Sequence, residues 1–281
     1  MKNVEDLAKE EWKRAKPFLR WAGSKRKQLA RLVTFWSATH LRYVEPFAGS
    51  ACLFFELAPR AAILGDNNRA LIDLYRVVRD NPERIYHRFS RIQRDADTYY
   101  RWRKKNPRTL DTESRAVRFL YLNRNCFNGI YRTNKAGEFN VPMGNRTGDY
   151  CTEEEFINSA SLLKRAKLIA GDFTRTLAYT RTGDFVYMDP PFALQSRRVF
   201  NDYGTQSFQS TDVPRLADSL RTIVAARADF LVSYADCTEA RGLAKEWNSI
   251  RLPIARHVGG NDRRRNAYEW LITNKILPSL D

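Results

Sequence analysis

The chain of 281 residues is long enough for one large domain with an insertion, and its 48 basic against 32 acidic residues give a formal net charge of +16 at pH 7. Neither a signal peptide nor a long apolar span is evident, so we expect a cytoplasmic protein with no membrane partner. The four cysteines lie far apart and the three histidines do not cluster, which argues against disulfides and against a metal site.

The positive charge is concentrated in a few segments. Lysines and arginines gather at 13–27, 101–108, 115–132 and 263–265, and aromatic residues stand between several of them. Arginines among aromatic side chains suit contact with phosphates and stacking on bases, so the leading partner is a nucleic acid. The alternative is that the charge serves solubility or reflects the source organism.

The first strong structural signal is a strand, a turn and a helix between 43 and 58. Tyr43 and Val44 precede the turn 45–50 (Glu-Pro-Phe-Ala-Gly-Ser), and the apolar stretch 51–58 follows it. Gly49 can adopt backbone conformations that other residues resist, and its missing side chain lets a ligand approach the main chain. This pattern is typical of a binding turn at the end of a buried strand.

Short strand patterns recur along the chain and alternate with helical ones. They lie at 43–44, 61–64, 167–170, 185–188, 229–233, 249–252 and 268–273. This alternation predicts an α/β fold with a doubly wound, mostly parallel sheet.

The interval 77–164 differs from the rest of the chain. Strand patterns vanish there, and charged helical patterns surround a loop at 123–149 that is rich in glycine and asparagine. We therefore expect a catalytic domain formed by residues 1–76 and 165–281, with an inserted helical domain at 77–164.

The most informative feature is the tetrapeptide Asp189, Pro190, Pro191 and Phe192, which follows the apolar run 185–188. Proline cannot continue a strand ladder, so the run ends in a turn that presents a carboxylate, a carbonyl and an aromatic ring. Ligands bind at this edge of open α/β sheets. The alternative is a loop punctuated by two prolines, with Asp189 as a cap and Phe192 in the core.

Taken together, these motifs resemble those of the Dam-type DNA adenine-N6 methyltransferases. The resemblance extends from about residue 18 to residue 274. It rests on the segments 18–25 (Phe-Leu-Arg-Trp-Ala-Gly-Ser-Lys), 45–50, 65–68 (Gly-Asp-Asn-Asn), 123–132 (Asn-Arg-Asn-Cys-Phe-Asn-Gly-Ile-Tyr-Arg), 137–142 (Gly-Glu-Phe-Asn-Val-Pro) and 189–192. The resemblance implies a Rossmann-like methyltransferase with an inserted target-recognition domain, acting on double-stranded DNA as a monomer in a bacterial, archaeal or phage-infected cell.

The resemblance implies S-adenosylmethionine as the cofactor. Trp21 and Lys25 would then meet its methionine portion, because an aromatic ring suits a cation and an ammonium suits a carboxylate. Asp66, after the second strand, is expected to accept the ribose hydroxyls, and a helix N-cap is its alternative role. The remaining cofactor residues that the resemblance implies are Glu45, Phe47 and Gly49 in the turn beneath the cofactor and Asp172 at its adenine. A plain turn is the alternative for Asp172.

The chemistry that the resemblance implies is methylation of an exocyclic amine. Asp189 and the Pro190 carbonyl would hold the amino hydrogens so that the nitrogen lone pair turns toward the methyl group. Asp189 need not remove a proton first. Phe192 would stack on an adenine flipped out of the duplex; many relatives have tyrosine at this position.

Sequence recognition is expected in the inserted domain. Arg132 has the fork geometry that pairs with guanine, and Phe127 would occupy the gap left by the adenine, with Asn128 beside it. Ile130 and Pro142 would pack on a thymine methyl group. Arg20 and Arg124 would contact phosphate or a flanking base, with a solvated surface position as the alternative for the arginines.

These roles predict methylation of adenine in GATC. The segment 143–149 departs from the pattern of some relatives, so the contact to the last base is the open point. Two other functions stay open at this stage: an RNA adenine methyltransferase with the same catalytic turn, and a catalytically inactive nucleic-acid-binding module.

Overall fold

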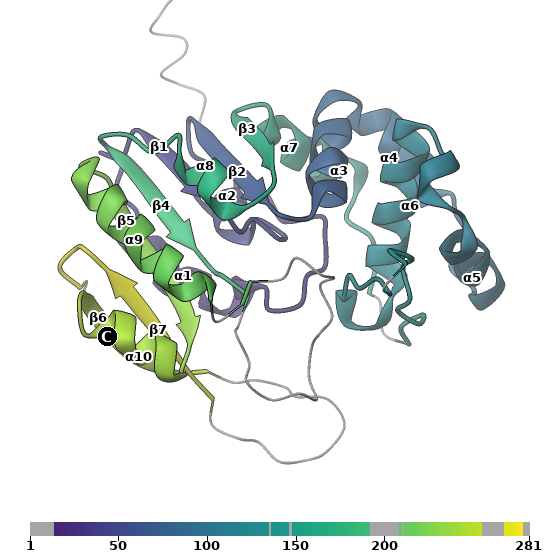
Figure 1. Cartoon of the computed structure of the whole chain (residues 1–281). Coiled ribbons are helices and arrows are strands. Elements are labelled where there is room, and N and C mark those ends of the chain that lie inside the picture. The colour runs from purple at the N-terminus through teal and green to yellow at the C-terminus, as the bar shows by residue number, and fades with distance from the viewer. Residues whose placement is uncertain are drawn as a thin grey trace, which may run out of the picture.

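A computed structural model describes residues 14–134, 136–145, 148–191, 208–209, 211–254 and 267–277. Phe192 and the arginines at 263–265 lie outside the described residues, and so do the expectations placed on them. The described chain forms a seven-stranded sheet with a group of helices beside it (Figure 1).

The sheet contains the seven strands that the sequence predicted. They are β1 (Arg42–Glu45), β2 (Ala62–Asp66), β3 (Ala166–Ala170), β4 (Asp184–Met188), β5 (Asp229–Ala235), β6 (Asn248–Ile254) and β7 (Ala267–Thr273). Their order in the sheet is β3-β2-β1-β4-β5-β7-β6. The first five are parallel, and β7 pairs antiparallel with both β5 and β6. The prediction of a doubly wound, mostly parallel sheet is confirmed.

Both faces of the sheet are buried, because each strand distributes alternate side chains to two different cores. Tyr43 and Tyr187 belong to the larger core, whereas Val44 and Val186 belong to a second core on the opposite face. All five positions of β4 are buried, which explains why its sequence is a nearly continuous apolar run. The sheet therefore provides a rigid base for residues at the strand ends.

Helices cover the two faces unequally. The second core includes residues of α8 (Phe173–Leu177), α9 (Asp212–Ala225) and α10 (Thr238–Ala244). The larger core includes residues of α1 (Leu29–Leu32), α2 (Cys52–Leu57) and the helices that follow β2. Those helices are α3 (Arg69–Asp80), α4 (Pro82–Ser90), α5 (Ala96–Lys104), α6 (Thr112–Asn125) and α7 (Glu153–Leu163).

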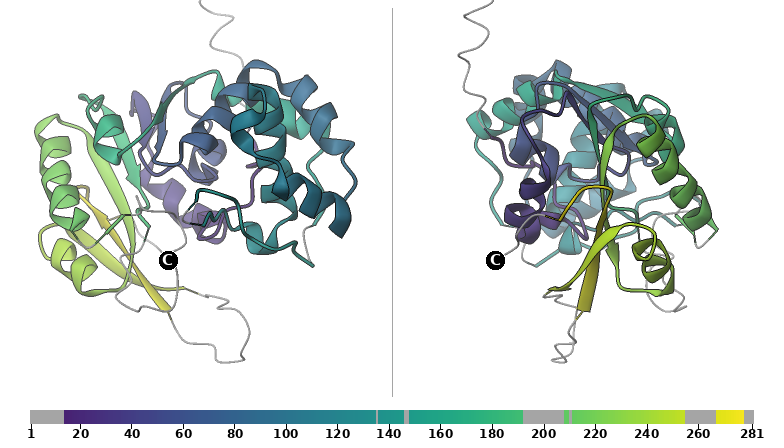
Figure 2. Two further views of the ribbon diagram at one scale, coloured as in Figure 1. Left: turned by 45° about the vertical axis from the view of Figure 1, so that its right-hand side comes forward. Right: turned by 90° about the vertical axis from the view of Figure 1, so that its left-hand side faces the viewer.

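Most of the helices that follow β2 stand beside the sheet rather than on it (Figures 1 and 2). Helix α3 packs against α6 and α7, and the expected domain boundary at 76/77 falls inside α3. Helix α6 extends to Asn125, so the first three residues of the expected loop at 123–149 are helical. Tertiary contacts hold their side chains: the Asn123 side-chain amide donates to the Arg20 carbonyl at 2.7 Å, and the Asn125 side-chain amide donates to the Tyr150 hydroxyl at 2.6 Å.

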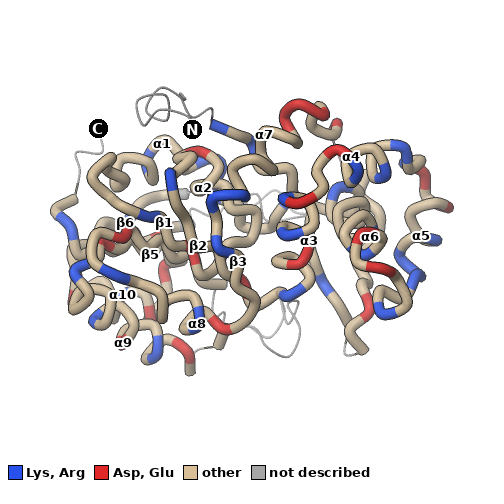
Figure 3. Tube along the Cα trace, turned by 90° about the horizontal axis from the view of Figure 1, so that it is seen from above, with Lys and Arg blue, Asp and Glu red and all other residues tan. Residues whose placement is uncertain are grey.

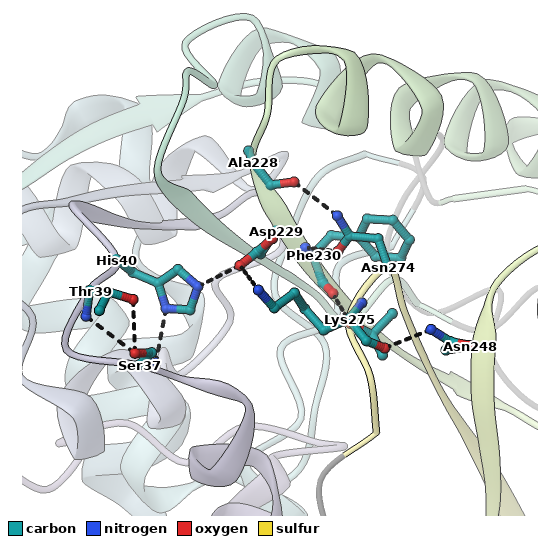
Figure 4. A network of polar contacts seen from close by, with 10 residues as sticks. Ser37, Thr39, His40, Ala228, Asp229, Phe230, Asn248, Asn274 and Lys275 are labelled. Atoms are coloured by element: carbon teal, nitrogen blue, oxygen red, sulfur yellow. Dashed lines mark hydrogen bonds and ion pairs between the residues drawn. The ribbon is translucent and has the colours of Figure 1, made fainter.

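A polar network lies at the amino-terminal end of β5, opposite the carboxyl ends of the parallel strands (Figure 4). Asp229, at the start of β5, accepts contacts from His40 at 2.9 Å and from Lys275 at 3.1 Å. Asn274 bonds to both backbone neighbours of Asp229, donating to the Ala228 carbonyl and accepting from the Phe230 amide at 3.0 and 2.8 Å. The end of β7 is thereby fastened beside β5.

Basic positions occur over the sheet as well as over the helical part, interspersed with acidic ones (Figure 3). Among the described residues, no helix has both the length and the apolar character needed to cross a bilayer.

Candidate active site

The site lies where the order of the parallel strands reverses. Strands β1 and β4 are neighbours; β2 and β3 continue the sheet on the side of β1, and β5 continues it on the side of β4. The carboxyl ends of parallel strands on either side of such a point leave a crevice for a ligand. Glu45, Asp66 and Asp189 stand at the carboxyl ends of β1, β2 and β4.

The turn after β1 is built around Gly49. Its φ of +48° lies in the left-handed region that favours glycine, and a Cβ there would stand 2.8 Å from the Trp21 ring. Trp21 therefore lies directly against this backbone. The buried Tyr75 hydroxyl donates to the Gly49 carbonyl at 2.6 Å and holds the turn from below.

Asp66 joins the turns that follow β1 and β2. Its two carboxylate oxygens accept the Gly49 amide at 3.0 Å and the Asn68 amide at 2.8 Å. Burial raises the pKa of Asp66 to about 6, although the two backbone bonds oppose the shift. The alternative role as a helix cap falls to Asn68, whose side chain accepts the Leu71 amide at the start of α3.

Glu45 is a buried acid at the end of β1. Only 3% of the residue is exposed, and its Oε2 atom accepts no hydrogen bond from the described residues. Burial raises its pKa well above the ordinary value and outweighs the neighbouring Tyr43 hydroxyl, which lowers it; the charges of Asp189 and Asp66 raise it further. A buried acceptor left unpaired is costly unless a ligand or a proton satisfies it, so Glu45 favours a cationic or hydrogen-donating ligand above the turn.

An aromatic cluster forms around Phe47, in the turn that follows β1. Phe47 stacks on Phe173 with ring centroids 5.4 Å apart, and Phe208 meets the Phe47 ring edge-on at 5.8 Å. Such a cluster offers an apolar wall for a flat ring.

Asp172 serves as a helix cap in this structure. Its Oδ1 atom accepts the Thr174 amide at 3.1 Å and a guanidinium N–H of Arg215 at 2.7 Å. Burial alone would raise its pKa, but these bonds lower it below the ordinary value. The turn interpretation thus accounts for the described contacts of Asp172, and its assignment to the cofactor adenine stays a prediction.

Asp189 is held by a buried lysine. Lys25 Nζ lies 3.1 Å from Asp189 Oδ1 and also donates to Glu269 Oε1. The Asp189 side chain is 22% exposed, whereas that of Lys25 is 7% exposed. Pro190 is buried and Pro191 is exposed, as expected where a strand leaves the sheet. The structure therefore brings Lys25, predicted for the cofactor, into direct contact with the predicted catalytic carboxylate.

Glu269 is the site residue that sequence reasoning missed. It lies on β7 with 1% exposure and accepts hydrogen bonds from Lys25, Gln28 and Ser233. The available signal was one acid among the apolar and aromatic residues at 268–272, because a charge at a buried strand position needs a partner.

The predicted recognition residues lie in the loop after α6. Phe127 is 48% exposed, and Asn128 and Pro142 are also exposed. Asn128 has a φ of +53°, and the Phe127 amide donates to the Pro142 carbonyl at 2.9 Å. A Cβ at Gly129 would stand 2.4 Å from Arg20 Cβ, so the loop is pressed against the segment that precedes Trp21.

Arg132 and Ile130 lie in the same loop. Arg132 Nε donates to Asn140 Oδ1 at 2.8 Å, and the Asn140 amide returns a bond to the Arg132 carbonyl at 3.2 Å. Ile130 is half-buried. The fork of Arg132 is thus oriented by a neighbouring amide, which limits the rotamers that it can adopt.

The other two predicted DNA-contacting arginines are held by backbone carbonyls. Arg20 donates to the carbonyls of Arg124 and Cys126 at 3.4 Å. Arg124 donates to the Asp149 carbonyl, and its guanidinium lies 5.8 Å from the centre of the Tyr150 ring. Both side chains are half-buried and support the loop as well as the surface.

One aromatic ring joins the cofactor segment to the recognition loop. Tyr131 stacks on Phe119 of α6 with centroids 4.5 Å apart, and it lies parallel to Trp21 at 6.4 Å. Asn123 adds a reciprocal pair of hydrogen bonds to the backbone of Arg20, at 3.0 and 2.7 Å. Among the described residues, no group of three acidic, histidine or cysteine side chains could hold a metal ion.

The fold and the residues at its strand ends define a Rossmann-like methyltransferase. Residues 21–256 match the family model of the D12 class N6 adenine-specific DNA methyltransferases, and the chain belongs to this family. The protein is therefore an adenine-specific DNA methyltransferase, as the resemblance predicted, and the family implies S-adenosylmethionine as methyl donor.

Curated relatives match over nearly the whole chain. The chain is 32% identical over 270 residues to the Type II methyltransferase M1.LlaDCHI of Lactococcus lactis subsp. cremoris, covering 92% of this chain and 95% of the relative. It is 30% identical to the Type II methyltransferase M.MjaIII of Methanocaldococcus jannaschii, covering 92% and 99%. It is 33% identical to a DNA adenine methylase of Serratia marcescens, covering 89% and 96%.

Proposed function

We propose that the protein methylates N6 of adenine in GATC after rotating the adenine out of the duplex. The observation that supports this most directly is the Asp189 carboxylate. It is partly exposed at the carboxyl end of β4, next to the end of β1, and Lys25 holds it there. An adenine stacked inside a duplex cannot reach a carboxylate at the end of a sheet strand, so the base must be extruded.

The residues of the crevice fit S-adenosylmethionine. Trp21 packs directly against the Gly49 backbone, the Glu45 oxygen that accepts no hydrogen bond from the described residues can receive a positively charged or donating group, and Asp66 presents a carboxylate for ribose hydroxyls. Phe47 would line the adenine side, with Asp172 nearby in the same wall. When bound, the cofactor supplies an electrophilic methyl group on a sulfonium.

Asp189 and Pro190 then act on the target amine. The carboxylate and the Pro190 carbonyl accept the two amino hydrogens, which withdraws the nitrogen lone pair from the ring and directs it toward the methyl group. Asp189 can take the proton that the product releases. Pro191 ends the strand, and Phe192 is proposed as the stacking face for the flipped base.

The loop after α6 is proposed to read the sequence. Arg132, oriented by Asn140, would pair with the guanine before the target, and the exposed Phe127 ring would replace the extruded adenine, with Asn128 beside it. Ile130 and Pro142 would pack on the thymine methyl group. Arg20 and Arg124 would contact the backbone or a flanking base. We assign this role to an inserted domain at 77–164 of a protein that acts as a monomer.

The test is expression in a host that lacks adenine methylation, followed by single-molecule sequencing of modified adenines. We expect modification at GATC. Modification concentrated at another motif would contradict the GATC assignment and leave the enzyme class intact. A parallel assay with labelled methyl groups on unmethylated duplex and on structured RNA should label the duplex; labelled RNA would favour the alternative substrate.

A further inference from the structure

Glu269 is a strongly buried acid that contacts Lys25, which in turn contacts Asp189. Its donors come from two other parts of the chain. Lys25 and Gln28 lie in the 3-10 helix η2 (Lys25–Gln28), and Ser233 on β5 donates its hydroxyl at 2.7 Å. A carboxylate with 1% exposure and this many donors has a fixed position.

The cluster has one ammonium between two carboxylates. Burial by itself would lower the pKa of Lys25, but Asp189 and Glu269 outweigh it and raise that pKa above its ordinary value. Burial would likewise raise the pKa of Glu269, and Lys25 with the other donors lowers it instead. Both groups are therefore charged at neutral pH, so the attraction between Lys25 and Glu269 persists while Asp189 engages another partner.

We propose that Glu269 is a positioning residue for methyl transfer, which holds the Lys25 ammonium beside Asp189 and thereby fixes the carboxylate that receives the target amine. This inference rests on the proposed role of Asp189. The sheet places the two acids near each other. β7 pairs with β5 through Glu269 and Ala235, and β5 pairs with β4, the strand that Asp189 follows.

The alternative is a structural ion pair that only joins η2 to β7. Breaking such a buried pair leaves an uncompensated charge and so lowers the free energy of unfolding. It would not change the kcat of the protein that remains folded. A positioning role predicts a lower kcat in protein that is fully folded. A displacement of about 1 Å at a reacting group can cost about 100-fold in rate.

The main variant is Glu269→Gln, assayed with a duplex that the wild type modifies. We expect kcat to fall about 10- to 100-fold, with little change in the Kd for duplex DNA. The basic limb of the kcat–pH profile should move to lower pH, because Lys25 loses one of its two counter-charges. The other titratable groups around the cluster are Glu45 on β1, Cys52 on α2 and Tyr187 on β4, and they are unchanged in this variant.

The matched control is Glu246→Gln. Glu246 forms an exposed ion pair with Arg221 at 2.8 Å, far from the strand ends that carry the site. This variant loses the same charge and should keep the wild-type kcat, pH profile and melting temperature. Ser233→Ala removes one hydrogen-bond donor from Glu269 and should lower kcat by a smaller factor than Glu269→Gln. This variant tests the proposal if Glu269→Gln does not fold.

A double variant tests whether Glu269 acts through Lys25. Lys25→Met alone should lower both kcat and the melting temperature, because it leaves Glu269 buried without its counter-charge. Adding Glu269→Gln should recover the melting temperature but not kcat. Wild-type kcat and pH profile in folded Glu269→Gln and Ser233→Ala would overturn the proposal. Failure of the wild type to modify GATC would count against the proposed function alone, because the variants are compared on whichever duplex the wild type modifies.

Discussion

The strand ends and the recognition loop are built in different ways. At the strand ends, Asp66, Asp189 and Glu269 are partly or fully buried, and each has a defined polar partner. In the loop, Phe127 is 48% exposed and Asn128 adopts a left-handed backbone conformation. The first arrangement fixes atoms before any ligand arrives, whereas the second presents side chains that can still adjust to a partner.

This difference separates two kinds of function. Fixed groups in a partly desolvated crevice suit electrostatic control of a reaction, because they need no reorganisation as the bond forms. Exposed rings and amides on a loop suit contact with base edges, where discrimination comes from a few contacts. Variants at the strand ends should therefore change the reaction on every sequence, and variants in the loop should change the choice of sequence.

The largest effect is expected for Asp189→Ala. Loss of the carboxylate would remove the proposed acceptor of the target amine, so methyl transfer should fall about 100- to 1,000-fold on any duplex. Affinity for S-adenosylmethionine, measured by calorimetry, should be largely retained. Asp218→Ala, at an exposed pair with Arg221, is the control. A large loss of cofactor affinity would place Asp189 in the cofactor site instead.

A smaller but still general effect is expected for Asp66→Ala. The substitution removes the bond to the Gly49 amide and the proposed acceptor for the ribose. Hydrogen bonds to a charged group contribute about 1.5–3 kcal/mol, so cofactor affinity should fall roughly 10- to 100-fold. Duplex affinity should stay close to that of the wild type. Unchanged cofactor binding would contradict the ribose assignment.

Arg132→Ala should instead change discrimination. A bidentate contact to guanine is worth about 1–3 kcal/mol, so the variant should lose that much preference for guanine at one position. With saturating cofactor and identical flanking sequence, its rate of methyl transfer should stay close to that of the wild type. Asn140→Ala should weaken the same preference less, because Asn140 only orients Arg132. The same site preference in the Arg132 variant and the wild type would exclude Arg132 from base recognition.

The smallest effect is a pH dependence of cofactor binding. Burial raises the pKa of Asp66 to about 6, so the carboxylate becomes protonated as the pH falls through that value. Affinity should be full well above pH 6, fall by about half near pH 6, and decline further below it, by up to about tenfold per pH unit well below the pKa. Calorimetry between pH 5 and 8 tests this, with Asp66→Asn as the variant that should lack the dependence. A wild-type curve as flat as that of the variant would argue against an ionised Asp66 in binding.

The same contrast explains what could be predicted from the sequence. The strands, the Gly49 turn and the ends of β2 and β4 carry local signals, namely apolar runs followed by glycine, acid or proline. Their predicted positions are confirmed in the described structure. The functional roles of the site residues rest on the family resemblance and stay predictions.

The role of Glu269 was missed because it depends on a contact between residues far apart in the sequence. Its partner Lys25 is 244 residues away in the chain, and no periodicity or turn pattern links the two positions. The N-cap of α3 was ambiguous for a related reason, because Asp66 and Asn68 are both residue types that suit an N-cap. Only the packing of the Gly49 turn determines that Asp66 accepts the Gly49 amide and that Asn68 caps the helix.

The place of β7 in the sheet has a consequence for synthesis. β7 follows β6 in the chain, yet it lies between β5 and β6, so β6 cannot join the described sheet until β7 has emerged from the ribosome. Until then the edge of β5 is open, and an open edge invites pairing with other chains. A product truncated before residue 267 would therefore lack Glu269 and leave this edge of β5 without its strand partner.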